Sequence, residues 1–234
     1  MKVEIRIIVL LVFSLLPQAV CARPSSKLDD RISAALLNQT TQRLGTGLMT
    51  PDAYGTPLII KLARQGDTQT LQQLTNNVSS GEFLLAQDTY GNNIFHVAKN
   101  AATIHILSSL VRRFYGANAP KMIAEMMNTR NRLGETPLHA QVNAGHADTF
   151  RPIYNHTSLK AKNEAANMRL TRLQGADESI VAQNKAIYCE EIVHLGSANG
   201  RTLLQAAQDQ VPYNPSMQLV AQEIKREIPC LADL

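Results

Sequence analysis

The sequence has no tryptophan, and aromatic residues make up only 5% of its 234 residues. Apolar residues as a whole make up 44%, which is enough for a sizeable core. So little aromatic content favours helices that pack through Leu, Ile and Ala over a β-sandwich. We therefore expect an all-α protein.

Clusters of charge and long apolar runs are also missing. Lys and Arg number 23 against 19 Asp and Glu, and the cations are scattered along the chain. Such scatter predicts neither a nucleic-acid groove nor a polybasic membrane patch. The apolar run at residues 7–16 is shorter than the ~20 residues of a membrane-spanning helix.

Catalytic signatures are absent as well. The sequence has no Gly-rich phosphate loop and no Gly-x-Ser-x-Gly elbow, and its Cys and His spacings match no zinc site. We therefore predict no cofactor and no metal. Cys189 and His194 are five residues apart, a spacing that does not place them squarely on one helix face. A thiol-dependent hydrolase using Cys189 is the alternative from a different class, and it predicts a free thiol there.

Residues 1–22 have the pattern of a secretory signal peptide. Lys2 and Arg6 precede the apolar run, and small residues follow it at Val20-Cys21-Ala22. We expect an exported chain, periplasmic or secreted, that begins near Arg23 and has no membrane span. Removal of the leader leaves two cysteines in a compartment where disulfides persist. The sequence thus predicts a disulfide between Cys189 and Cys230, with two unrelated buried thiols as the alternative.

Residues 131–146, NRLGETPLHAQVNAGH, contain a pattern that recurs along the chain. Gly134 can supply the positive φ of a tight turn, Thr136 can cap the next helix, and Pro137 fits its first turn. Weaker versions follow Gly55, Gly91 and Gly200, so the steps between first glycines are 36, 43 and 66 residues.

This pattern resembles the ankyrin repeat, whose period is about 33 residues. The resemblance covers about residues 52–212 and implies an ankyrin-repeat solenoid of helix pairs with short finger loops, ending in an irregular C-terminal half. We expect an N-terminal capping helix and loop over 23–50, then an ankyrin-repeat domain over 51–234. Its repeats begin near residues 52, 88, 131 and 197, and 155–196 is either an insertion or a diverged repeat.

The resemblance also implies the role of a protein-binding module with no catalytic activity of its own. Ankyrin repeats bind through finger tips and exposed inner-helix positions. Carried over by position, the finger-tip candidates are Tyr54, Tyr90, Arg130, Arg132 and Arg201, and the inner-helix candidates are Lys61, Gln65, Lys99 and Asn143. Tyr and Arg are typical interface hot spots. The predicted partner is another protein, and the chain itself is predicted to be a monomer. A periplasmic inhibitor or immunity-like protein and a secreted effector are variants of this hypothesis.

Overall fold

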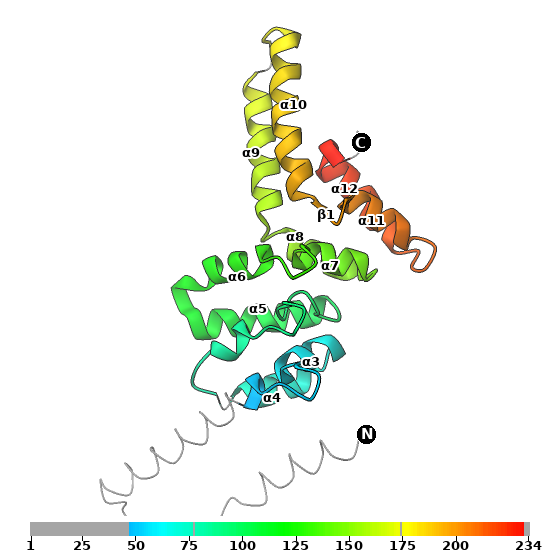
Figure 1. Ribbon diagram of the computed structural model, residues 1–234. Coiled ribbons are helices and arrows are strands. Elements are labelled where there is room, and N and C mark those ends of the chain that lie inside the picture. Colours follow the sequence, from blue (N-terminus) through cyan, green and yellow to red (C-terminus); the bar gives the residue numbers. More distant parts are fainter. Residues whose placement is uncertain (1–46, 77, 174, 232–234) are drawn as a thin grey trace, which may run out of the picture. The chain divides into compact units, whose positions relative to one another are not determined.

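The structure is a computed structural model that describes residues 47–76, 78–173 and 175–231 (Figure 1). All of them belong to one unit, Thr40–Leu234. Helices dominate, and the described residues form one sheet, the antiparallel pair β1 (Ser197–Ala198) and β2 (Arg201–Thr202). The prediction of an all-α chain is confirmed at this level.

The predicted leader and most of the predicted capping segment lie outside the described residues. Within that segment, residues 47–49 form a helical turn where the sequence predicted a loop. Leu48 explains the difference, since it is only 2% exposed and belongs to the core.

The first layer consists of α3 (Leu58–Gln65) and α4 (Thr68–Asn76), which pack against each other. Helix α3 buries an apolar stripe that consists of Ile59, Ile60, Leu62 and Ala63. It ends at Gly66, whose φ of 70° is the left-handed conformation that stops a helix. The 3₁₀ turn η1 (Glu82–Leu85) follows α4.

The second layer is built on one long helix, α5 (Ala101–Tyr115), which packs against α4. Asn100 caps it, because its side chain accepts a hydrogen bond from the backbone N–H of Thr103. The turn η2 (Gly116–Asn118) then leads into α6 (Ala119–Asn128), which returns along α5. Helix α6 accounts for the longer second step in the glycine spacing.

The third layer contains α7 (Pro137–Asn143), the turn η3 (Ala147–Thr149) and α8 (Phe150–Tyr154). Helix α8 is only five residues long and has Pro152 within it, which removes a backbone donor. Helix α7 packs against α6 and α8, and α8 packs against α5.

A helical hairpin of α9 (Ser158–Arg172) and α10 (Glu178–Leu195) follows, and its two helices pack against each other. Beyond β1 and β2, the chain forms α11 (Leu203–Gln210), α12 (Met217–Glu227) and the turn η4 (Pro229–Leu231). Helix α11 packs against α7 as well as α12. Helices α11 and α12 form a fourth layer. This layer packs directly on the third one, although the α9–α10 hairpin lies between the two layers in the sequence.

A disulfide joins Cys189 of α10 to Cys230 of η4, with 5.1 Å between their Cα atoms. Next to it, the side chain of Leu231 lies against Gly196 and is 2% exposed. The bond therefore fixes η4, the last turn that the structure describes, to α10. None of the described helices combines the length and the apolar character that crossing a lipid bilayer requires.

The second layer lacks the inner helix that the repeat spacing predicted. Residues 92–100 form turns and extended chain, because other groups take the backbone bonds that a helix would use. The Gln141 side chain donates to the carbonyls of Phe95 and His96, and the N–H of Lys99 donates to the carbonyl of Ala63. Lys99 was predicted on an inner helix and instead lies in this extended segment.

Candidate functional site: a row of exposed tips on three matching loops

Three loops precede the first three layers and share one geometry. Loop 1 is residues 52–56, loop 2 is residues 88–92, and loop 3 is residues 131–135. In each, the first residue's side-chain Oδ1 accepts two backbone N–H bonds, from the third and fifth residues. The six bonds are all 2.9 Å long, and they involve Asp52 with Tyr54 and Thr56, Asp88 with Tyr90 and Asn92, and Asn131 with Leu133 and Glu135.

The fourth residue of each loop is a glycine in the left-handed region. Gly55, Gly91 and Gly134 have φ values of 74°, 75° and 76°, where a side chain is strained. Each glycine N–H donates to the carbonyl of its own loop's first residue, at 2.9 to 3.0 Å. The glycine spacing in the sequence therefore marks three copies of one turn.

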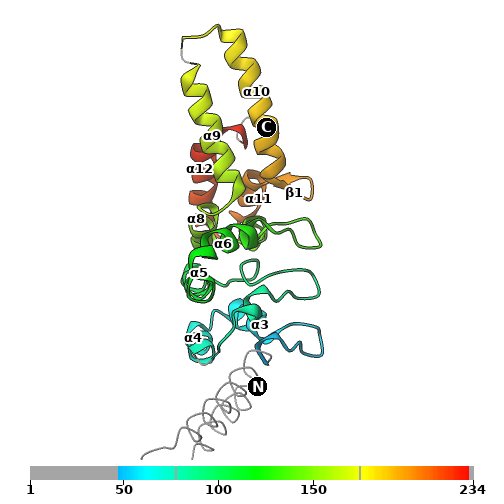
Figure 2. The same cartoon turned by 90° about the vertical axis from the view of Figure 1, so that its left-hand side faces the viewer.

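Successive loops also touch. A Cβ at Gly55 would collide with the γ-methyl of Thr89, and a Cβ at Gly91 would meet the backbone N of Arg132 at 3.4 Å. The N–H of Arg132 donates to the carbonyl of Tyr90 at 2.9 Å. Figure 2 shows the loops protruding on one side of the helices, one above another. They form a continuous surface.

The third residue of each loop points to solvent although it is large and apolar or aromatic. Tyr54 is 84% exposed, Tyr90 63% and Leu133 57%. We name these three side chains the tip row. The sequence prediction contained both tyrosines but missed Leu133. Leu133 could have been found from the sequence, because it immediately precedes Gly134 as Tyr54 precedes Gly55 and Tyr90 precedes Gly91.

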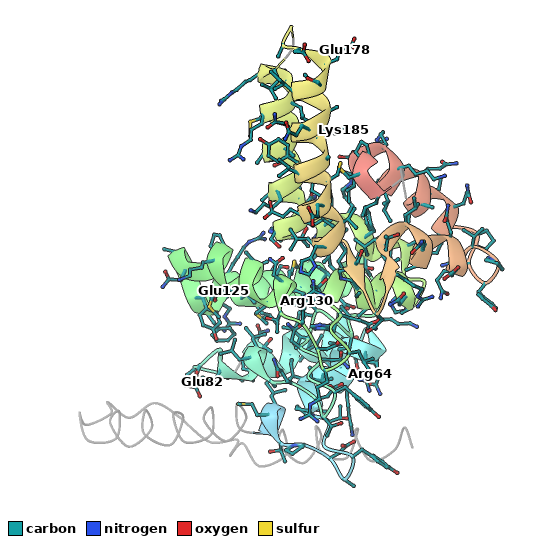
Figure 3. The ribbon with its side chains drawn as sticks, turned by 45° about the horizontal axis from the view of Figure 1, so that its top comes forward. Arg64, Glu82, Glu125, Arg130, Glu178 and Lys185 are labelled. Atoms are coloured by element: carbon teal, nitrogen blue, oxygen red, sulfur yellow. A yellow bond between two sulfur atoms is a disulfide. The ribbon has the colours of Figure 1, made fainter. Side chains whose placement is uncertain are left out.

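The other predicted binding residues divide into two groups. Arg132, Gln65 and Lys99 are exposed. The remaining side chains of the prediction bond within the protein, with Lys61 at 2.5 Å from Asp52, Arg130 at 2.5 Å from the carbonyl of Gly134, Arg201 at 2.8 Å from Asp209, and Asn143 at 2.6 Å from Glu135. The structure thus places Arg130 in support of loop 3; Figure 3 labels this side chain.

Charge inside the loops is balanced by nearby cations. The hydrogen bond from Lys61 is the largest cause that lowers the pKa of Asp52 to about 2, and the backbone N–H of Thr56 adds to it. Asp88 is 6% exposed and lies 3.1 Å from the guanidinium of Arg64. The carboxylates of Asp52 and Asp88 therefore hold their loops closed through hydrogen bonds and ion pairs within the protein.

Two buried histidines connect the layers behind the loops. His96 Nε2 lies 3.0 Å from the carbonyl of Glu135, so it joins the second layer to loop 3. His139 occupies the equivalent position one layer later, and its Nδ1 lies 2.7 Å from the hydroxyl of Thr136. That hydroxyl bonds the ring and forms no backbone cap of α7, contrary to the sequence prediction.

His139 Nε2 is buried and has no hydrogen-bond partner among the described residues. The Gly196 carbonyl on that side accepts instead from the N–H of Leu203 at 2.8 Å. A small cavity of about 60 Å³ lies beside His139 and is also lined by Leu138, Leu159 and Leu195. The Nε2 atom of His139 therefore lies next to a small cavity and not next to a hydrogen-bond acceptor of suitable geometry among the described residues.

Cys189 is bonded to Cys230, so its sulfur is not a free thiol. His194 is exposed near the end of α10. Among residues 47–76, 78–173 and 175–231, no three His, Cys, Asp or Glu side chains gather closely enough to hold a metal ion. No protein-family model matches the chain, and a search of curated proteins found no match.

Proposed function

We propose that this chain is an exported ankyrin-repeat protein that binds another protein through the tip row. The observation that carries the proposal is the threefold recurrence of one loop geometry with an exposed apolar or aromatic side chain at the same place: Tyr54, Tyr90 and Leu133. A repeated solvent-exposed apolar position has no packing purpose, whereas it fits a binding surface.

The arrangement of the helices supports the ankyrin part of the proposal. Each matching loop leads into a short inner segment and then an outer helix, and successive layers pack on each other. In this proposal α9 and α10 are an insertion within the third repeat, because α11 packs directly against α7. The fourth repeat begins at the β1–β2 turn, where Gly200 has a φ of 73°.

Rigid loops make the tip row suitable for binding. Two side-chain bonds and a glycine hold each loop, so little backbone entropy remains to be lost when a partner docks. Tyrosine offers a large apolar area with a polar end, as interface hot spots commonly do. Arg132 beside the row adds an exposed cation that favours a partner with carboxylates nearby.

Export is supported by two separate features. The leader pattern of residues 1–22 is one, and the bond between Cys189 and Cys230 is the other, since disulfides are rare where thiols are kept reduced. In this proposal the disulfide is structural, which leaves no nucleophile for the thiol-hydrolase alternative.

The test is affinity capture by the full-length chain in its native host. One bait is unchanged, and a second carries Tyr54→Ala, Tyr90→Ala and Leu133→Ala. A third carries Tyr213→Ala and Leu219→Ala, which are 84% and 68% exposed but lie outside the loops. We expect a protein retained by the first and third baits and lost by the second, with a dissociation constant at least about a hundredfold weaker for the tip-row variant.

A partner that the second bait still retains would overturn the assignment of the tip row. If no protein is retained by any bait, the binding proposal fails. The thiol-hydrolase alternative then requires an activity that appears on reduction and disappears in Cys189→Ala.

A further inference from the structure

The tip row has a regular spacing because each of its side chains belongs to one layer. The outer helices of successive layers, α4, α5 and α8, pack on each other, and packed helices lie about 8–10 Å apart. The three loops share one geometry and touch their neighbours. Tyr54, Tyr90 and Leu133 therefore recur about every 8–10 Å along the side of the molecule on which the loops protrude (Figure 2).

The backbone at the tips has its donors occupied. The N–H groups of Tyr54, Tyr90 and Leu133 each donate to the side chain of their loop's first residue. The N–H of the glycine that follows donates to a carbonyl of the same loop. A partner strand that extends a sheet needs free main-chain groups on the surface that it joins. The tips therefore contact a partner through their side chains.

The spacing of the tips matches the repeat of an α-helix. Residues seven apart in a helix lie on one face and are about 10.5 Å apart along its axis. In a strand, residues on one face are about 6.7 Å apart, or about 13 Å if every second one is skipped. Only the helix comes close to the 8–10 Å step of the layers. A helix that contacts all three tips needs about 15 residues.

A free cation lies at the third tip. Arg132 is exposed, and its guanidinium has no hydrogen-bond or ion-pair partner within the described parts of the chain. The cations near loops 1 and 2 differ, because Lys61 is paired with Asp52 and Arg64 with Asp88. Arg132 is therefore complementary to a carboxylate on the partner, next to the residue that contacts Leu133.

We infer that the partner presents an amphipathic α-helix to the tip row. An apolar residue at every seventh position of that helix faces Tyr54, Tyr90 and Leu133 in turn, and an Asp or Glu faces Arg132. The inference rests on the binding function proposed for the tip row and adds the structure of the partner's contact surface to it.

The test is photocrosslinking by the full-length chain in its native host. The photoreactive residue p-benzoylphenylalanine replaces Tyr54, Tyr90 or Leu133, one position in each variant, and mass spectrometry identifies the partner residue to which it bonds. All three side chains are exposed, so the replacements leave the core intact. We expect three crosslink sites in one segment of the partner, with successive sites about seven residues apart.

The same replacement at Tyr213, which is 84% exposed outside the loops, is the control and should not crosslink to that segment. Crosslink sites two to four residues apart, or sites scattered over several segments, overturn the helix and leave the tip row as the binding surface. If no partner is captured, or if a partner is captured without a crosslink from any tip, the proposed function fails and the inference fails with it.

A charge exchange tests the contact at Arg132. Arg132→Glu should weaken binding of the crosslinked partner about tenfold, and replacing the partner's facing carboxylate with Lys should restore it. Lys225→Glu on α12 changes the net charge equally away from the loops and should leave the dissociation constant unchanged. A dissociation constant that Arg132→Glu does not alter overturns the acidic position of the helix.

Discussion

At the scale of single residues, Gln141 has the most unusual position. It is 1% exposed, and its amide donates to the carbonyls of Phe95 at 3.1 Å and His96 at 2.9 Å. Its Oε1 lies 2.7 Å from Nδ1 of His146. A polar side chain can be buried in this way because its partners replace the water it loses. Gln141 therefore stabilises the extended segment that replaces an inner helix.

We predict that Gln141→Ala lowers the free energy of unfolding by about 2–4 kcal/mol. The substitution leaves two buried carbonyls and a ring nitrogen without that partner and opens a cavity. Urea titration followed by circular dichroism measures the effect. Gln208→Ala, on the exposed side of α11, is the matched control and should change stability by less than about 0.5 kcal/mol. Equal effects in both variants would contradict the role of Gln141.

A second residue-scale prediction concerns pH. Burial, with the nearby charge of Arg130, lowers the pKa of His139 from 6.5 to about 4. Burial also lowers the pKa values of His96 and His146. Below pH 6.5 the unfolded chain binds protons that the folded chain refuses, so stability is full above that pH and falls as the pH approaches 4. For His139 alone the loss amounts to about 3 kcal/mol.

Unfolding measured by urea at pH 7 and at pH 4.5 tests this prediction. His139→Gln should reduce the difference between the two values, since Gln has no proton to gain. Protonation of His139 is not the cause if the variant loses as much stability at pH 4.5 as the unmodified chain does.

At the scale of elements, the matching loops depend on contacts between neighbours. Gly55 and Gly134 have nearly the same φ, but Gly55 faces the γ-methyl of Thr89 whereas nothing lies within 4 Å of a Cβ built at Gly134. Alanine at Gly134 should therefore cost about 1–2 kcal/mol for the left-handed backbone alone. Alanine at Gly55 should cost at least about 1 kcal/mol more.

A double-mutant cycle measures the extra cost. In a Thr89→Ser background the methyl is gone, so Gly55→Ala should cost the same as Gly134→Ala. Thermal unfolding of the single and double variants supplies the four values. If Thr89→Ser brings no relief, the strain lies elsewhere in loop 1.

The three matching loops could be predicted from sequence because their signal is local. A glycine three residues after Asp or Asn marks each of them. The unwound segment at 92–100 could not be predicted, because Gln141, which binds its carbonyls, comes 45 and 46 residues later. The exposure of Leu133 was not predicted, because leucine side chains are usually buried and only its position in the loop indicates otherwise.

At the scale of the whole molecule, the disulfide determines how firmly the last layer is held. Cys189 and Cys230 are 41 residues apart, and closing a loop of that length restricts the unfolded chain by up to about 4 kcal/mol in the chain-entropy treatment. We predict that reduction lowers the free energy of unfolding by this order. Denaturation with and without reductant measures it.

The variant Cys189→Ser with Cys230→Ser should match the reduced protein and be indifferent to reductant. A chain whose stability is the same in all these states would show that the bond adds no stability. The same variants separate a structural disulfide from a catalytic thiol, because only the second gains activity on reduction.

The same bond also determines how the chain responds to a pull on its ends. Tension passes from Cys189 to Cys230 through the sulfurs, so β1, β2, α11 and α12, which lie between the two cysteines, carry no load. In an optical trap the oxidised chain should extend about 140 Å less than the reduced one, the length of 41 stretched residues. The fourth layer, α11 and α12, therefore does not extend under force until the disulfide is reduced, while the first three layers bear the force.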